Sequence, residues 1–384
     1  SASTTGQQLM MEARARRLEV IADALGTLPV EDQQAVVRAA ASLRTLSSRV
    51  PESAERLDAI VAELDPDAPW AHPRAAELDS ISFEQWLANE VEDTLARDLL
   101  RAFMAGGYMT KPADTFSLLG ALATIAGAGS VANLFEPDLC LNARVVGGSQ
   151  VIPLRLADRL GERVLLDRPV RSLAWSDAGV AVEAGGTHVR ARHAIVAVPP
   201  NVAGSIRYDP PLPAWRMRLH QAMTQGDVIK VLAVYEEPFW RAEGLAGEGF
   251  APYGFVREVY DNTPPAGRPG VLCVFLAGER AVAAERLDRA ERVRRVLEGL
   301  ADLVGPRARD AVEVVERNWS EEEWTRGAYA ATFGLGGLSR HGPDLTRAVG
   351  PIHWACTDLA GIGHMHMEGA VRSGKAAAAA ILAS

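Results

Sequence analysis

Apolar residues recur at helical spacing through most of the first 130 residues of the chain. The spacing predicts a helix over residues 9–25, a second over residues 31–46 and a third after Pro51. Asp79, Ser80 and Ser82 are candidate N-caps for residues 82–104, which we expect to form two helices. The almost wholly apolar residues 116–129 predict a buried helix.

The pattern changes to period-two alternation after a glycine-rich turn at residues 144–150 and a short helix. Alternating runs with turn residues between them predict β-strands. The first group of runs predicts a small antiparallel meander that ends in a buried strand, over residues 162–176, 179–186 and 187–200. Four more strands are expected, at residues 227–240, 253–260, 270–278 and 311–319, with a helix over residues 288–305. Strands that alternate with helices predict a mixed α/β (α+β) fold in two domains.

Composition and charge exclude several classes of protein. The 384 residues are 48% hydrophobic and 23% charged, which is ordinary for a globular protein. A net charge of -9 argues against nucleic acid as a partner, because phosphate contacts need a basic surface. No apolar run approaches 18 residues, so no membrane span is expected. Three widely spaced cysteines, an odd number, favour a reducing compartment and a cytoplasmic location.

Two glycine-rich stretches are candidates for nucleotide binding. Residues 127–132 match G-x-G-x-x-A, but they follow a helix and no acidic residue ends a second strand, so we interpret them as a helix C-terminal turn. Residues 145–150 precede a helix, whose free N–H groups suit a phosphate. Most loops of this kind are only turns.

The C-terminal segment, residues 356–382, concentrates soft ligands in the turn that leads into an alanine-rich helix. Nitrogen and sulfur ligands of this kind are typical of copper sites. The candidate ligands are His353, Cys356, Asp358, His364, Met365, His366 and Met367. Core packing is one alternative to a metal. The glycines among them indicate another, in which the backbone approaches a planar or bulky group closely.

Five segments, taken in order, resemble the flavin-containing amine oxidases, the monoamine oxidase family. They are RVVGGSQVIPLRLADRLGERVLLDRPVRSLAW, HAIVAVPPNVAGSIRYDPPLP, VIKVLAVYEEPFWR, NWSEEEWTRGAYAATF and GPIHWACTDLAGIGHMHMEGAVRSGKAAAAAIL. The resemblance implies an FAD-dependent fold in which a FAD domain is interleaved with a substrate domain of sheet and helices. The implied FAD domain comprises residues 145–219 and 327–384, and the substrate domain residues 1–144 and 220–326.

The resemblance also implies a set of site residues. Ala328 stands where some members attach flavin through a cysteine, so the FAD is expected to be noncovalent. The N-terminus of the last helix would face the flavin, which suits the negative charge of reduced flavin. Tyr329 and His366 are the implied catalytic pair. The implied cofactor-binding residues are Val170, Trp319, Trp324, Thr357, Asp358, Met367 and Glu368.

The chain departs from the family pattern at the implied active site. The second of two facing aromatic rings is usually a tyrosine, and His366 takes its place. Gly363 stands where an aromatic residue is common, and the lysine that holds a water near the flavin is not found at the expected place, Glu279 and Arg280. An ordinary variant of the site, a changed substrate and a degenerate enzyme all stay open.

The resemblance implies oxidation of an amine C–N bond to an imine, with O2 as acceptor and H2O2 as product. We expect a small amine as substrate, a dimer or higher oligomer, and no nucleic-acid or membrane partner. The family's first strand, with its G-x-G-x-x-G turn, has no counterpart in the sequence. Three explanations stay open: the segment is cleaved or omitted, it is carried by a second chain, or flavin binding is lost. The alternatives are therefore a flavin-binding or noncatalytic subunit that needs a second chain, and a desaturase of the same superfamily.

Overall fold

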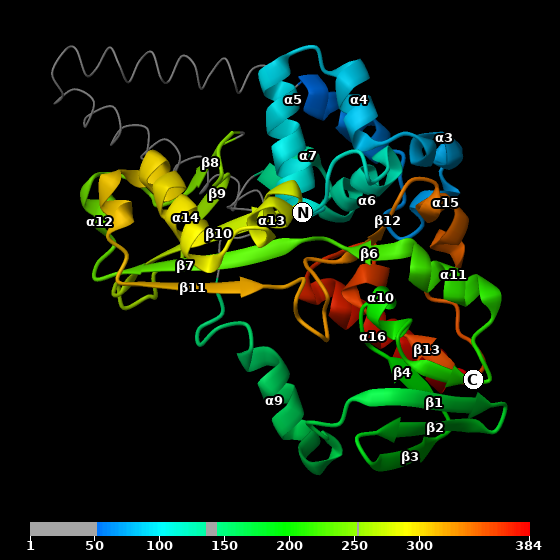
Figure 1. Ribbon diagram of the computed structural model, residues 1–384. Coiled ribbons are helices and arrows are strands. Elements are labelled where there is room, and N and C mark those ends of the chain that lie inside the picture. Colours follow the sequence, from blue (N-terminus) through cyan, green and yellow to red (C-terminus); the bar gives the residue numbers. More distant parts are fainter. Residues whose placement is uncertain (1–51, 136–143, 252) are drawn as a thin grey trace, which may run out of the picture. The chain divides into compact units, whose positions relative to one another are not determined.

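Of the candidate N-caps, Ser82 begins a helix, whereas Asp79 and Ser80 lie in the last turn of the helix before it, α3, Ala75–Ser80 (Figure 1). The structure, a computed structural model, describes residues 52–135, 144–251 and 253–384, so the helices predicted over residues 9–25 and 31–46 lie outside the described residues. Residues 52–61 are helical, as predicted after Pro51. The elements that follow are η1 (Pro69–Ala71), α3 (Ala75–Ser80), α4 (Phe83–Glu90), α5 (Thr94–Arg101), η2 (Ala102–Tyr108), α6 (Leu118–Ala128) and α7 (Val131–Phe135).

Side-chain caps explain why residues 82–104 break into separate helices. Ser82 accepts a hydrogen bond from the Gln85 N–H at 3.1 Å, and the Gln85 side chain accepts one from the Ser82 N–H at 3.0 Å, which is a capping box. The Asp93 carboxylate accepts a hydrogen bond from the Ala96 N–H at 2.9 Å and so caps α5, and the π-helix η2 follows α5 directly. The buried helix α6 ends at Gly129, whose φ of 96° only glycine adopts readily. The interpretation of residues 127–132 as a helix C-terminal turn is confirmed.

The four strands expected after residue 227 form one antiparallel sheet with a fifth, short strand, β8, in the order β11-β7-β10-β9-β8. The strands are β7 (Val228–Tyr235), β8 (Gly249–Phe250), β9 (Glu258–Asp261), β10 (Gly270–Ala277) and β11 (Glu313–Asn318). Three helices accompany them, α12 (Phe239–Ala242), α13 (Glu279–Glu285) and α14 (Arg289–Val304), with η4 (Pro306–Arg309). The helix expected over residues 288–305 is α14.

One face of this sheet is the core of the region. Ile229, Val231 and Ala233 of β7 are buried against Val296 and Leu300 of α14. Successive side chains of a strand point to opposite faces, so the residues between them lie on the other face. Figure 1 shows α14 lying along the sheet, consistent with this shared core.

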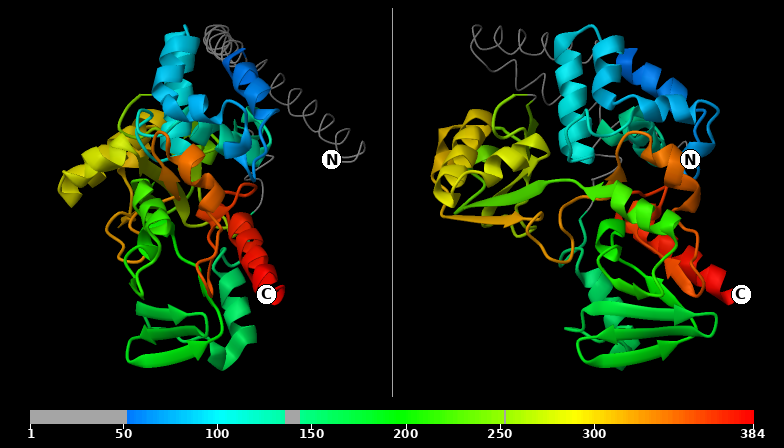
Figure 2. Two further views of the ribbon diagram at one scale, coloured as in Figure 1. Left: turned by 90° about the vertical axis from the view of Figure 1, so that its right-hand side faces the viewer. Right: turned by 45° about the vertical axis from the view of Figure 1, so that its right-hand side comes forward.

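A second core lies among segments that are far apart in the sequence. Leu173, Val196, Leu219, Phe333 and Trp354 belong to one buried cluster. Its elements are β1 (Val170–Ser176), β2 (Gly179–Ala184), β3 (Thr187–Ala191), β4 (Ala194–Val196), α10 (Pro200–Ala203), β5 (Arg207–Asp209), α11 (Ala214–Ala222), β6 (Met223–Gln225), β12 (Ala331–Phe333), α15 (Gly337–His341), η5 (Gly342–Asp344), β13 (Ile352–Trp354) and η6 (Thr357–Leu359). The last helix, α16 (Met367–Leu382), lies beside β13 in both views of Figure 2.

The predicted meander is correct for β1, β2 and β3 and wrong for the buried strand expected at its end, within residues 193–200. β1, β2 and β3 pair antiparallel, and β5 joins β1 in parallel. β4 belongs to another sheet, in which it pairs in parallel with β13. Its middle residue, Ile195, is 40% exposed, whereas we expected a buried strand. Alternation along a strand predicts which face is apolar, but it carries no information on which distant strand is the partner.

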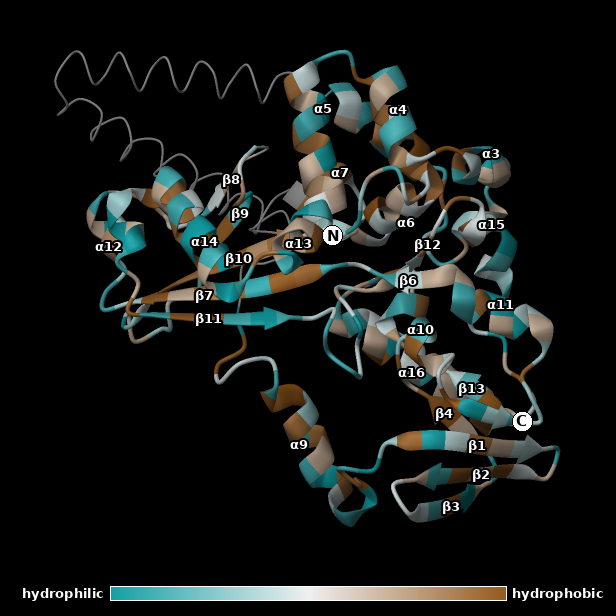
Figure 3. Cartoon of the chain, in the orientation of Figure 1, coloured by the Kyte–Doolittle hydropathy of each residue, from teal (hydrophilic) through white to brown (hydrophobic). Residues whose placement is uncertain are grey.

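The short helix expected after residues 144–150 is α9 (Val151–Leu160), which continues into η3 (Gly161–Arg163). None of its residues is buried in the described structure. Figure 3 shows hydrophobic residues along α9, and Leu154, Leu156 and Leu160 are each at least half exposed. No helix among the described residues is long and apolar enough to cross a membrane.

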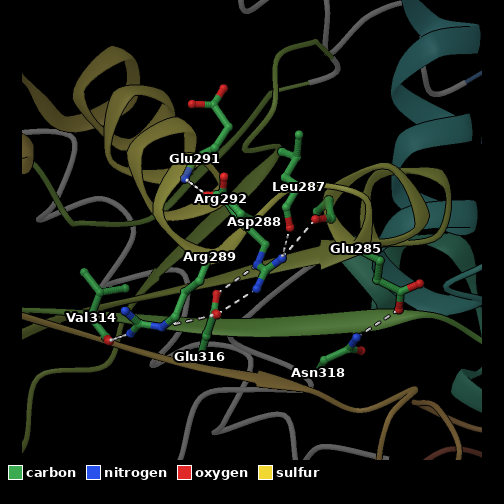
Figure 4. Close-up of polar contacts among 10 residues, drawn as sticks. Glu285, Leu287, Asp288, Arg289, Glu291, Arg292, Val314, Glu316 and Asn318 are labelled. Carbon is green, nitrogen blue, oxygen red and sulfur yellow. Dashed lines mark hydrogen bonds and ion pairs between the residues drawn. The ribbon is translucent and has the colours of Figure 1, made fainter.

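An ion pair fixes α14 on the edge strand β11 (Figure 4). Arg292 donates two hydrogen bonds to the Glu316 carboxylate, at 2.8 and 2.9 Å, and both side chains are about 15% exposed or less. Arg292 also donates to the carbonyls of Ala284 and Leu287, which end the preceding helix. Since the bidentate pair is largely shielded from water, it is stronger than the surface ion pairs of the same helix.

We expect Glu316→Ala to lower the free energy of unfolding by about 2 kcal/mol, because it leaves a largely buried guanidinium without its carboxylate. Urea denaturation monitored by circular dichroism measures the change. Arg294→Ala is the matched control, since Arg294 makes two ion pairs on the same helix with a side chain that is 54% exposed. An equal loss in both variants would contradict the importance of burial.

Candidate active site

The outer face of the five-stranded sheet carries polar and aromatic side chains. Lys230 of β7 lies opposite Phe275 of β10, and Cys273 lies opposite Tyr260 of β9. Glu258 is two residues before Tyr260 and so shares its face. These five side chains belong to the face opposite the α14 core. The part of this face formed by β7, β9 and β10 therefore combines apolar surface with the Glu258 carboxylate and the Lys230 ammonium group, and Arg317 of the edge strand β11 lies opposite Lys230.

Tyr329 covers this face from the segment that follows β11. Its ring meets Phe275 edge to face, with the ring centroids 5.9 Å apart. Burial raises the pKa of Tyr329 well above its ordinary value, and the nearby Glu258 carboxylate adds to the increase. The phenol is therefore neutral, and Tyr329 offers an aromatic surface rather than a proton.

Glu258 is a buried carboxylate that has no basic partner in the part of the chain that the structure describes. It is 5% exposed, and its one hydrogen bond among the described residues comes from the Tyr260 hydroxyl at 2.9 Å. Burial raises the pKa of Glu258 to about 7, and the hydrogen bond from Tyr260 offsets part of that increase. Burial of an unpaired carboxylate is unfavourable, so a cation that reached Glu258 would be stabilised there.

Lys230 is a site residue that the sequence analysis missed. The lysine was sought near Glu279 and Arg280, which form the first turn of α13. The structure places the Lys230 Nζ atom 5.4 Å from the centroid of Phe275, beside Tyr329. The available signal was a single charged residue within the alternating apolar strand that begins at Val228. Glu258 was missed too, because a charged residue in a half-buried strand normally faces water.

The turn before α16 is built by glycines that no larger residue could replace. Gly363 has a φ of 76°, and a Cβ on Gly369 would lie 2.3 Å from the Gly363 carbonyl oxygen. The Thr357 hydroxyl donates to the carbonyl of His366 at 2.8 Å and so closes the turn. The structure thus brings Thr357 to the segment of His366, Met367 and Glu368, and their contact with a cofactor stays a prediction.

The N-terminus of α16 has the features that a flavin would need. Its N-cap residue, His366, makes no side-chain capping bond, and the N–H groups of Met367 and Glu368 have no partner among the described residues. Free N–H groups at the start of a 16-residue helix favour an anionic or carbonyl-rich edge. The Met367 side chain is 46% exposed. The glycine turn and the free donors together fit a flat ring with electronegative atoms at its rim.

The Asp358 carboxylate makes its hydrogen bonds within the protein. Its carboxylate is 5% exposed and accepts a hydrogen bond from the Ala331 N–H at 2.7 Å and one from the Cys356 thiol at 3.4 Å. Burial raises the pKa of Asp358, and these hydrogen bonds oppose the rise. The carboxylate therefore joins the turn before α16 to the strand that follows Tyr329. A contact of Asp358 with a cofactor stays a prediction.

The remaining predicted cofactor contacts lie in two places. Val170 begins β1 and is 36% exposed. Its neighbour Arg171 lies over the ring of Trp324, 5.1 Å from the centroid, which brings these two predicted contacts close to each other. Trp319 is held by backbone hydrogen bonds to Val228 and Gly327.

The facing pair predicted for Tyr329 and His366 is not visible as a ring contact in the described structure. Tyr329 contacts Phe275, whereas the His366 ring hydrogen-bonds to the carbonyl of His364 at 2.8 Å and is exposed. The catalytic roles of both residues stay predictions. Among the described residues, no group of three or more His, Cys, Asp or Glu side chains has the arrangement of a metal site.

Comparisons with known proteins agree with this geometry. The family model for flavin containing amine oxidoreductase matches residues 14–382. Putrescine oxidase of Kocuria rosea is 46% identical over 338 residues, which cover 85% of this chain and 71% of that protein. The probable flavin-containing monoamine oxidase A of Dictyostelium discoideum is 36% identical, over 84% of this chain and 71% of that protein.

Solved structures give the same result. Putrescine oxidase bound to putrescine superposes with a TM-score of 0.87 at 46% identity, over 88% of this chain and 76% of that one. Cyclohexylamine oxidase from Brevibacterium oxydans superposes with a TM-score of 0.80 at 30% identity, over 86% of this chain and 74% of that one. The mixed α/β fold and FAD as the cofactor, both predicted from the sequence, are confirmed. The chain belongs to the flavin-containing amine oxidoreductase family.

Proposed function

We propose that this protein oxidises the C–N bond of a short α,ω-diamine such as putrescine to an imine, with O2 as the acceptor and H2O2 as the product. The observation that carries the proposal is the buried carboxylate of Glu258, which has no basic partner within the described ranges and lies beside Tyr329. A monoamine would leave that carboxylate uncompensated. The 46% identity to a protein named putrescine oxidase supports the same substrate class.

Glu258 would bind the distal ammonium group of the diamine. A cation restores the charged form of the carboxylate by an attraction that is strong in a site shielded from water. The Tyr260 hydroxyl already occupies one carboxylate oxygen, Oε2, and so orients the group. The methylene chain of the substrate would lie against the rings of Phe275 and Tyr329, which are 5.9 Å apart.

Lys230 would set the protonation state of the reacting nitrogen. Its ammonium group is near Phe275, on the same sheet face as Glu258. A positive charge there disfavours a second cation, so the nitrogen at that end of the diamine would bind in its neutral form. Opposite charges at the two ends of the site therefore orient a diamine that carries one proton.

The residues around α16 would hold FAD, with the N–H groups of Met367 and Glu368 at its electronegative edge. FAD, when bound, supplies the two-electron chemistry, accepting a hydride from the carbon next to nitrogen and passing the electrons to O2. We further propose the division into a FAD domain, residues 145–219 and 327–384, and a substrate domain, residues 1–144 and 220–326. The buried clusters support it, since one falls wholly within residues 229–308.

A subunit that acts only with another polypeptide segment is the alternative function. The parallel pair of β4 and β13 has three residues in each strand, which is too short to be stable alone. Apolar side chains on either side of α9 are also exposed, including Leu166 at 76% and Val146 at 89%. Exposed apolar surface on this scale is typical of an interface. We propose that a strand-and-helix segment packs against α9 and the free edge of β4 to complete the FAD site.

Glu258→Gln should lower kcat/KM for putrescine by about 10- to 100-fold, because a neutral amide replaces one charge-assisted hydrogen bond. The kcat/KM for butylamine, which lacks the distal ammonium group, should decrease little. Steady-state oxygen consumption with both amines measures the ratio. Glu279→Gln, which alters an exposed carboxylate at the start of α13, is the control.

The ratio of kcat/KM for putrescine to kcat/KM for butylamine should depend on pH. Above about pH 7 Glu258 is ionised and the diamine is preferred, and the preference should fall as pH decreases through the pKa of about 7. Division by the butylamine value removes the titration shared by all amines. A diamine preference that is independent of pH and of Glu258→Gln would disprove the role of this carboxylate.

FAD should be released completely when the flavin-loaded protein is precipitated with acid, because Ala328 provides no thiol for a covalent bond. The absorption spectra of the supernatant and of the redissolved pellet measure the partition. Ala328→Cys is the matched comparison, as it introduces the thiol at that position. Yellow colour that stays with the pellet of the unaltered protein would rule out noncovalent binding.

Leu156→Ser together with Leu166→Ser should reduce the flavin content of the purified protein if a segment packs on this surface. Both leucines are already more than half exposed, so the free energy of unfolding of the described fold should change little. Leu382→Ser, at an 88% exposed position on α16, is the control. Unchanged flavin content in the double variant would argue that this surface is free in the working protein.

A further inference from the structure

Lys111 is a buried lysine that the proposed chemistry does not use. Its Nζ atom lies within 3.1 Å of four oxygen atoms, the carbonyl and hydroxyl oxygens of Thr224 and of Thr332. These two threonines are direct partners across the two-stranded sheet of β6 and β12. An ammonium group has three hydrogens, so it is fully used by this pair of residues.

The positive charge of Lys111 is stabilised by two carboxylates that are not in direct contact with it. Burial lowers the pKa of Lys111 to about 8, and Asp227 and Asp358 are the two carboxylates that oppose this decrease. Neither forms an ion pair with Lys111 among the described residues. The four oxygen contacts therefore account for the burial of the ammonium group.

The preceding residue, Thr110, contacts the segment that contains Tyr329. Its hydroxyl is 2.6 Å from the carbonyl oxygen of Ala328, the residue before Tyr329. A Cβ on Gly226 would lie 1.8 Å from this hydroxyl, so the two chains are in direct contact. The carbonyl of Thr110 accepts a hydrogen bond from the Asp227 N–H at 2.9 Å, which anchors the start of β7.

We infer that Lys111 is a positioning residue, which holds the strand after Tyr329 so that the tyrosine ring faces Phe275 and the Lys230–Glu258 face of the sheet. Side chains contact the backbone on both sides of Tyr329, at Ala328, Ala331 and Thr332. Lys111 supplies the contact at Thr332, three residues after the ring, and ties it to β6. The functional consequence rests on the role proposed above for Tyr329.

Fluorine NMR on the chain labelled with 3-fluorotyrosine tests the structural part without cofactor or substrate. The sequence has six tyrosines, and Tyr329→Phe assigns the resonance of Tyr329. Lys111→Met, which keeps the length of the side chain and removes the donors, should shift or broaden that resonance. Thr332→Val, the milder variant, should produce a smaller change of the same kind and covers a failure of Lys111→Met to fold.

Asp79→Asn is the matched control for loss of buried polar contacts. Asp79 is fully buried and accepts hydrogen bonds from Ser117 and Ser339, which tie α6 and α15 to α3. The Asp79→Asn variant should leave the chemical shift of the Tyr329 resonance unchanged. A Tyr329 resonance that is unchanged in Lys111→Met, or that moves equally in Asp79→Asn, would overturn the inference.

A double-mutant cycle on the flavin-loaded protein tests the functional part. Lys111→Met should lower kcat/KM for putrescine about tenfold, as expected for a displaced binding surface, and should have no further effect in the Tyr329→Leu background. Equal effects in both backgrounds would overturn the inference. If Tyr329→Leu alone leaves amine oxidation unchanged while the fluorine shift persists, the role of Tyr329 fails and the positioning by Lys111 stands.

Discussion

The sheet of β7, β9 and β10 has to separate an apolar core from a charged site across the thickness of one strand. Alternation makes this separation: Val231 points to the α14 core, and Lys230, its neighbour, points to the site. A shift of register by one residue would bury Lys230 and expose the core. The antiparallel pairing of eight residues between β7 and β10 fixes that register, and the positions of the site residues depend on it.

The site adds elements from outside the sheet by polar contacts rather than by apolar packing alone. Asp358 binds the backbone at Ala331, and Lys111 binds it at Thr332. Both groups are buried and charged or chargeable, so each keeps its partners because an unsatisfied group there would be costly. Tyr329 is placed between two regions of the chain by these contacts, and neither region would place it by itself.

Negatively and positively charged groups lie in different parts of the site, and this separation agrees with the proposed substrate. Glu258 gives one end negative character, and Lys230 makes another part unfavourable for a cation. The free N–H groups at the start of α16 provide a third electrostatic element, suited to an electronegative ring edge rather than to an amine. Substrate and cofactor are thus matched to opposite local charges.

The sequence by itself determined the elements whose cause is local. Ser82 begins one helix and Gly129 ends another through contacts with residues three or four positions away, so their patterns predicted these boundaries correctly. The order of motifs from residue 144 onward was sufficient to indicate the family and the cofactor. Only the tertiary structure decided the partner of β4 and the positions of Glu258, Lys230 and Lys111. Each of these depends on contacts between residues far apart in sequence, such as the 221 positions between Lys111 and Thr332, and no local pattern encodes such a separation.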